Sequence, residues 1–98
     1  MIVYEVNLKI SSSVFSEYEI WLDSHIEKMM KFEGFCKFKV YKIQSKNNKQ
    51  RLISIHYYIK NISCLNEYLD ENSKKMRLEG IEKFYNKVLI TRRILLEK

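Results

Sequence analysis

Hydrophobic and polar residues alternate along the first ten positions of the chain. The apolar residues of this segment fall at every second position, namely Ile2, Tyr4, Val6, Leu8 and Ile10. A period of two over nine residues is typical of a half-buried β-strand. Residues 35–43, 52–60 and 88–96 continue in strand-like patterns, so the sequence predicts four strands.

A helical period replaces the alternation after residue 13. Spacings of three and four residues give one apolar stripe along a predicted helix, formed by Val14, Tyr18, Trp21, Leu22, His25 and Met29. The serines at 11–13 are candidate N-caps for this helix. Gly34 is placed to end it, as the residue that follows the C-cap.

A second helix is predicted between the last two strands. Asn61 or Ser63 is its candidate N-cap, and its apolar positions include Leu65, Tyr68, Leu69 and Met76. Residues 71–73 can break or re-cap this helix, and Gly80 weakens it. Residues 44–50 are polar, and Asn47 and Asn48 tolerate positive φ there, as a hairpin turn requires.

The predicted order β-α-β-β-α-β is that of the ferredoxin-like fold. Right-handed crossovers then give an antiparallel sheet of strand order 4-1-3-2 with both helices on one face. We expect the apolar sets that begin with Tyr4, Phe38 and Ile53 to pack under the helices. The opposite face would carry mostly polar side chains: Glu5, Asn7, Lys9, Lys37, Lys39, Tyr41, Ser54, His56, Tyr58 and either Arg92 or Arg93.

Composition limits the class of protein. A chain of 98 residues, 46% of them hydrophobic, suits one domain over 1–98. A charged share of 31% and the lack of a long apolar run argue against a membrane partner. The first residues do not resemble a signal peptide. We expect Cys36 and Cys64 to be reduced thiols in a cytoplasmic protein.

The polar sheet face holds the sequence's main candidate site. Strands one and three are neighbours in the expected order, so Glu5 could orient His56 as a general base is oriented. Asn7 and Tyr58 could add hydrogen bonds to a ligand, and Arg93 or Arg92 could pair with an anion. The alternative interpretations are a solvated face or the seam of a dimer.

Other chemistry is less well supported. Nucleic-acid binding through the sheet is disfavoured, because Glu5 and Asn7 stand where an RNA-binding strand needs an aromatic. The basic hairpin 37–51 suits an anion, but lysines also protect an edge strand from pairing. His25 lies on an apolar stripe and is more simply a packing residue. No metal-ligand spacing is present, so we expect no metal and no cofactor.

The chain resembles a family of short bacterial proteins known only as a domain of unknown function. This family belongs to the dimeric α/β-barrel proteins, relatives of the antibiotic-biosynthesis-type monooxygenases. The likeness runs essentially end to end, through the segments 4–7, 21–22 with 25–26, 34–35, 65 with 68–69, 77 with 79–80 and 84, and 92–95. Glu27 departs from the family pattern, which tends to have proline there.

The resemblance implies a homodimer whose two sheets face each other around a cavity, and it supplies no catalytic residue. Haem-degrading relatives are poor matches, since strand three lacks their tryptophan and helix two lacks their histidine. Quinone-forming relatives need no cofactor. Two hypotheses follow: a homodimeric small-molecule-binding or structural module, and a cofactor-independent, monooxygenase-like enzyme acting on a small aromatic substrate.

Overall fold

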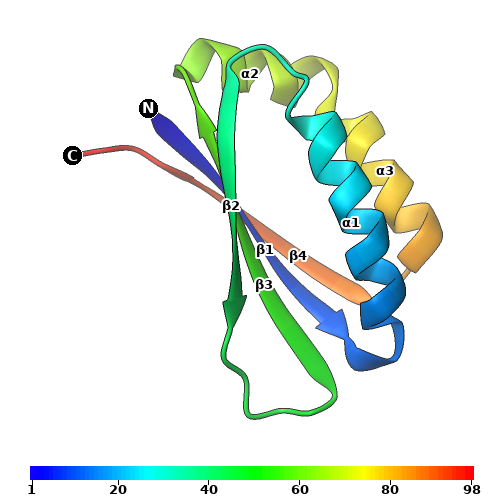
Figure 1. Cartoon of the computed structure of the whole chain (residues 1–98). Coiled ribbons are helices and arrows are strands. Elements are labelled where there is room, and N and C mark those ends of the chain that lie inside the picture. Colours follow the sequence, from blue (N-terminus) through cyan, green and yellow to red (C-terminus); the bar gives the residue numbers. More distant parts are fainter.

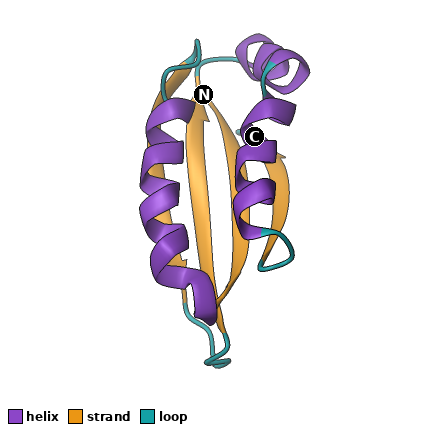
Figure 2. Cartoon of the chain, turned by 90° about the vertical axis from the view of Figure 1, so that its right-hand side faces the viewer, coloured by secondary structure: helices purple, strands orange, loops and turns teal.

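Four antiparallel strands form one sheet in a computed structural model that describes all residues 1–98. Helices cover one face of this sheet and leave the other face open, as Figures 1 and 2 show from two directions. In chain order the elements are β1 (Ile2–Ser11), the 3₁₀ turn η1 (Ser12–Val14), α1 (Phe15–Met29), β2 (Phe35–Ile43), β3 (Gln50–Ile59), α2 (Ile62–Glu71), α3 (Ser73–Phe84) and β4 (Val88–Leu95).

The sheet order is β2-β3-β1-β4, which is the predicted 4-1-3-2 order viewed from the other edge. All three strand pairs are antiparallel. The ferredoxin-like fold predicted from the alternating and helical periods is therefore confirmed. None of the helices combines the length and the apolarity that a membrane span requires.

The ends of α1 differ from the prediction. No serine caps the helix, because residues 12–14 form a 3₁₀ turn and Ser12 donates its hydroxyl to the carbonyl of Asn48 instead. The helix ends at Met29, well before Gly34. Gly34 has a φ of 85°, and a Cβ there would lie 2.5 Å from the Cβ of Cys64. This glycine serves the turn into β2 and the close approach of α2, not the helix end.

The second predicted helix is two helices, α2 and α3, which meet at Asn72. The side chain of Asn61 accepts a hydrogen bond from the backbone N–H of Cys64, so Asn61 is the N-cap of α2. The break expected at residues 71–73 is confirmed. It lets α2 cross one end of the sheet while α3 runs alongside α1 (Figure 2).

The hairpin between β2 and β3 closes without a positive φ. Asn47 accepts hydrogen bonds at both its side chain and its carbonyl, from the N–H groups of Lys49 and Gln50. Asn86, in the turn before β4, has the one positive φ outside glycine, at 54°. The expectation for Asn47 and Asn48 was therefore wrong, because side-chain hydrogen bonding shapes that turn.

The core lies between the helices and the covered face of the sheet. The buried hydrophobic side chains form one cluster: Tyr4, Leu8, Ile10, Tyr18, Leu22, Ile26, Met29, Phe35, Ile53, Ile55, Tyr57, Ile59, Leu65, Tyr68, Met76 and Phe84. The prediction failed at β2, where Phe38 and Val40 are 44% and 43% exposed. Both share the helix-side face by register, but β2 is the edge strand and no helix covers it (Figure 1).

Candidate functional site

Register places Glu5 at the centre of the open face. It stands opposite His56 of β3 on one side and Arg93 of β4 on the other. Arg93 Nε donates to Glu5 Oε2 at 2.5 Å, and Asn7 Nδ2 donates to the same oxygen at 2.9 Å. His56 Nε2 lies 3.3 Å from the other carboxylate oxygen, Oε1. Four of the five predicted site residues therefore form one network.

The electrostatics of this network keep Glu5 ionised. Hydrogen bonds from Arg93 and then Asn7 hold the pKa of the Glu5 carboxyl down at about 2, although burial opposes this shift. Glu5 is only 6% exposed, because the surrounding side chains cover it. A buried carboxylate is stable only when it is paired and hydrogen-bonded. Here Oε2 accepts both hydrogen bonds, and Oε1 has the His56 ring as its neighbour.

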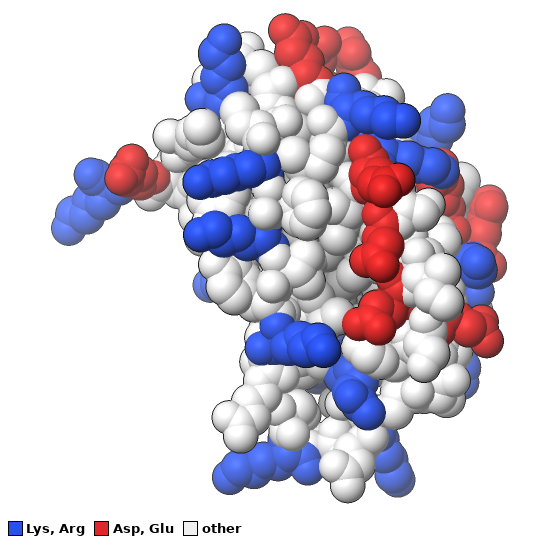
Figure 3. Space-filling model, in the orientation of Figure 1, with Lys and Arg blue, Asp and Glu red and all other residues white.

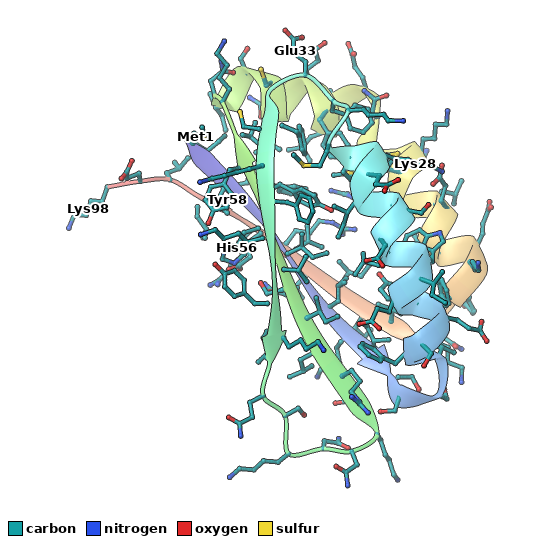
Figure 4. All side chains as sticks on the ribbon, in the orientation of Figure 1. Met1, Lys28, Glu33, His56, Tyr58 and Lys98 are labelled. Atoms are coloured by element: carbon teal, nitrogen blue, oxygen red, sulfur yellow. The ribbon has the colours of Figure 1, made fainter.

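The remaining predicted residues have different surroundings. Tyr58 lies on the open face, as does His56, and Figure 4 shows both pointing away from the helices. The ammonium group of Lys37 sits 4.7 Å from the centre of the Tyr58 ring. Arg92, the alternative to Arg93, lies on the covered face opposite Val6. Its assignment to the Glu5 site was wrong, because adjacent residues of a strand point to opposite faces.

The chemistry available at Glu5 is limited by its own contacts. Arg93, Asn7 and His56 already engage the carboxylate, so Glu5 orients these groups more readily than it attacks or deprotonates a substrate. A ligand role for Glu5, Asn7, His56, Tyr58 and Arg93 stays a prediction. The network equally suits an interface between two copies of the chain, because an unpaired charge would be costly to bury there.

A cavity lies on the other side of the sheet, between β1, β4, α1 and α3. Its volume is about 90 Å³, and 16 of its 21 lining residues are hydrophobic. Aromatic rings make much of the wall: Tyr4, Tyr18, Trp21, Tyr57, Tyr68, Phe84 and Tyr85. The exposed residues Ile81, Tyr85, Asn86 and Ile90 place its mouth where α3 turns into β4.

Gly80 and Trp21 shape one wall of this cavity. A Cβ at Gly80 would lie 2.9 Å from Cη2 of Trp21, so only a glycine lets the indole of α1 approach α3 this closely. The Trp21 ring stacks on His25 at a centroid distance of 4.6 Å and meets Phe84 edge-on at 5.8 Å. Tyr18 and Met29 are buried, as the stripe predicts, whereas Trp21 and His25 are half-buried at the cavity wall.

Three basic side chains reach this apolar wall. His25 Nδ1 and Arg77 Nε are buried and have no hydrogen-bond partner. Arg77 Nη2 donates to the hydroxyl of Tyr4 at 3.1 Å. Arg92 lines the same cavity from β4. Buried polar atoms are usually hydrogen-bonded, so two unpartnered nitrogens mark a place where a ligand or a water can bind.

Burial shifts the ionisation of these groups. Desolvation lowers the pKa of His25 below its usual value, so the imidazole is neutral at pH 7. Desolvation likewise lowers the pKa of Arg92, and the nearby charge of Arg77 acts in the same direction. Burial also raises the pKa of the Tyr18, Tyr57 and Tyr68 hydroxyls, to about 12 for Tyr68, so these three groups stay protonated.

Sequence reasoning missed this cavity almost entirely. It named His25 but favoured a packing role, and it gave no role to Arg77. One signal was present: a histidine on an otherwise apolar helical stripe, facing strands that carry Tyr4 and Tyr57 on their covered face. The chain brings together no group of three or more histidine, cysteine, aspartate or glutamate side chains that could hold a metal.

Charged side chains outside both sites separate into two bands. Lysines and Arg51 follow β2 and the hairpin, and acidic side chains follow α1, as Figure 3 shows. Lys42, Asn47, Arg51 and neighbouring hairpin residues border an open hollow that is not enclosed by aromatic rings. The exposed lysines on the β2 edge suit the protective role that the sequence suggested.

Solved structures share this fold at low sequence identity. A dimeric ferredoxin-like protein from an uncultured marine organism superposes with a TM-score of 0.74 at 12% identity, over 99% of this chain and 95% of its own. A candidate antibiotic biosynthesis monooxygenase from Deinococcus radiodurans gives 0.70 at 13% identity, over 100% and 95%. SnoaB, a cofactor-independent oxygenase from Streptomyces nogalater, gives 0.69 at 9% identity, over 99% and 93%.

Identities this low establish the fold and nothing finer. No curated protein matches the chain. One family model, however, matches residues 1–98, and its description is "Domain of unknown function (DUF4286)". The end-to-end resemblance seen in the sequence is confirmed, and the likeness to monooxygenase-type structures is one of fold. The chain belongs to the DUF4286 family.

Proposed function

We propose that this protein is a homodimer that binds a compact aromatic molecule in the cavity between the helices and the sheet. The observation that carries the proposal is the combination of an aromatic wall with two buried nitrogens, His25 Nδ1 and Arg77 Nε, that have no partner. Ligand pockets are mostly apolar with a few polar groups that fix orientation. A volume of about 90 Å³ suits a single ring.

The open face supports the homodimer. Three apolar side chains on this face are well exposed, with Leu89 at 65% and Tyr41 and Ile43 at 44% each. Val3, Leu52, Tyr58 and Leu95 border the Glu5 network on the same face. A two-fold partner would cover these side chains, burying roughly 1,000 Å² or more, as a specific interface does. A dimeric protein of the same fold is among the solved structures.

Calorimetric titration with benzyl alcohol tests the binding proposal, and Trp21 provides a second signal because it is the only tryptophan. We expect saturable binding and a change in Trp21 emission. Ile90→Phe should weaken binding by filling the mouth of the cavity. Ile94→Phe is the matched control, since Ile94 lies on the same face of β4 but outside the cavity.

Two results would reject this function. If benzyl alcohol and phenol both fail to bind the wild-type protein, the cavity is only a packing defect. If Ile90→Phe and Ile94→Phe bind equally well, the ligand sits elsewhere. Sedimentation velocity at micromolar concentration tests the dimer separately, and a monomer mass there would remove that half of the proposal.

A second function is favoured by one specific observation, the neutral, unpartnered imidazole of His25 in an aromatic cavity. Such a group can accept the proton of a phenol, and a phenolate is the form that reacts with O2. One oxygen atom of O2 would become the second carbonyl of a quinone, and the other would leave as water. The O2 is the oxidant, so no cofactor is required.

Oxygen uptake in the presence of phenol tests this enzyme hypothesis. We expect uptake above the protein-free rate, and His25→Ala should reduce it by about 100-fold, as loss of a general base does. Ser24→Ala, a change at the exposed neighbouring residue of α1, is the control. Equal rates with and without the protein would leave binding as the function.

A further inference from the structure

We infer that the cavity selects a single-ring aromatic anion, such as a benzoate, whose oxygens lie against Arg77 and Arg92 while its ring packs among the aromatic side chains. The inference rests on the proposed binding function and adds the charge of the ligand. It starts from the balance of charges around the cavity, because the 21 lining residues include two arginines and no aspartate or glutamate.

The protein itself does not neutralise these two arginines. Arg77 makes one side-chain hydrogen bond, to the Tyr4 hydroxyl, and its Nε has no partner. Arg92 makes no side-chain hydrogen bond or ion pair, although it is partly buried. Partial burial removes some of the water around a guanidinium, and a bound anion would compensate for that loss.

A carboxylate near His25 of the cavity wall is already engaged. Glu79 lies on α3 beside this region, but it pairs with Lys28 of α1 at 3.3 Å and does not line the cavity. Figure 4 labels Lys28 near the C-terminal end of α1, and its ion pair with Glu79 connects α1 to α3. The contrast with Arg93 is direct, because that neighbour of Arg92 has the Glu5 carboxylate as its partner.

The rest of the cavity wall favours a ligand that contains an aromatic ring. Tyr18, Trp21 and Phe84 form a continuous aromatic group, with the Tyr18 and Phe84 ring centres 4.9 Å apart. An aromatic ligand can stack or meet such rings edge-on. An inorganic anion would satisfy the arginines alone and would leave this wall without a contact.

Paired titrations with benzoate and benzamide test the inference, since the two differ chiefly in charge. Benzoate should bind at least about tenfold more tightly than benzamide, because a charge-assisted hydrogen bond is stronger than a neutral one. Arg92→Met should bring the two affinities within about threefold of each other, whereas Arg92→Lys should keep much of the preference. Arg51→Met, which removes an equal charge at the hairpin, should keep all of it.

Each outcome separates the inference from the proposed function. If benzamide binds as tightly as benzoate, the ligand need not be an anion, and the proposal of aromatic binding still stands. If inorganic phosphate binds as tightly as benzoate, the ligand need not contain an aromatic ring. If benzyl alcohol, benzamide and benzoate all fail to bind, the proposed function itself is wrong. Should Arg92→Met not fold, loss of the benzoate preference at high salt in the wild-type protein supports the inference, and a salt-independent preference contradicts it.

Discussion

Arg92 and Arg93 are neighbours in β4, yet the two faces of the sheet give them opposite environments. Arg93 is largely exposed on the open face and pairs with the buried carboxylate of Glu5. Arg92 lies on the covered face, where it lines an aromatic cavity and has no acidic partner. The protein has therefore already paired the arginine on the open face, and it has not paired the arginine on the covered face.

The two faces of the sheet suit different functions, namely dimer formation on the open face and ligand binding on the covered face. A paired network such as Glu5 with Arg93, Asn7 and His56 can be covered by another protein surface at modest cost, because few unsatisfied groups remain. An unpaired group in a cavity, such as Arg77 Nε, gains most from a ligand that supplies the missing partner. The open face thus suits a second copy of the chain, and the covered face suits a small molecule.

The largest expected effect contrasts two adjacent tyrosines of β3. Tyr57 is 1% exposed in the core, so Tyr57→Ala should lower the free energy of unfolding by about 3–5 kcal/mol. Tyr58→Ala, on the open face, should lower it by less than about 1.5 kcal/mol when both variants are compared as monomers. Urea denaturation measures both values. Equal losses would show that the open face contributes to the monomer core.

The next effect concerns the dimer. Leu89→Glu places a charge on the exposed part of the open face and should weaken association by about 10- to 100-fold, since burying a leucine is worth about 1.5–3 kcal/mol. Leu78→Glu changes an exposed leucine on α3, away from the sheet, and should leave association unchanged. Sedimentation equilibrium compares them. If only Leu78→Glu dissociates the dimer, the interface lies on the helices and not on the open face of the sheet.

Acid should weaken the Glu5 network in a defined range. The folded pKa of Glu5 is about 2 against an ordinary value of 4.5, so the folded state binds fewer protons than the unfolded chain between these values. The Glu5 contribution is therefore complete above about pH 4.5 and is lost as the pH falls toward 2. Glu5→Gln should be less stable at neutral pH and lose less stability across this range. Parallel acid profiles for the two proteins would contradict the pairing.

The smallest effect belongs to His25 on the covered face. Burial lowers its pKa, so the unfolded chain binds the proton more readily, and stability should fall as the pH drops below 6.5. The loss should be less than about 1.4 kcal/mol per pH unit, which is the limit for one group. His25→Leu should remove this slope between pH 6.5 and the folded pKa.

The fold could be predicted because its signals are local. Strict alternation in β1 and a helical stripe in α1 report which face each side chain occupies, whatever its distant neighbours are. The break at Asn72 was likewise visible as a run of residues that favour caps. The errors at Gly34 and at the serines before α1 arose because a helix end depends on contacts with other segments. Cys64 and Asn48 supply those contacts.

Register explains why one site was predictable and the other was not. Once the strand order was known, Glu5 could be expected near His56, because both lie on one face of neighbouring strands, and the register places them opposite each other. No comparable rule connects Arg77 of α3 with Arg92 of β4. Their shared cavity depends on how far the helices stand from the sheet, and on Gly80 admitting Trp21 between α1 and α3.

The sequence by itself determined the strands, the helices and the polar character of one sheet face, since each follows from the period of the side chains. The sheet order then followed from the right-handed crossover rule. Only the tertiary structure decided which of Arg92 and Arg93 lies on the covered face, and that β2 leaves Phe38 and Val40 uncovered. It also decided that an aromatic cavity with unpaired nitrogens lies under the helices. The physical reason is that a cavity and an unpaired charge are properties of packing between distant segments, which no local period records.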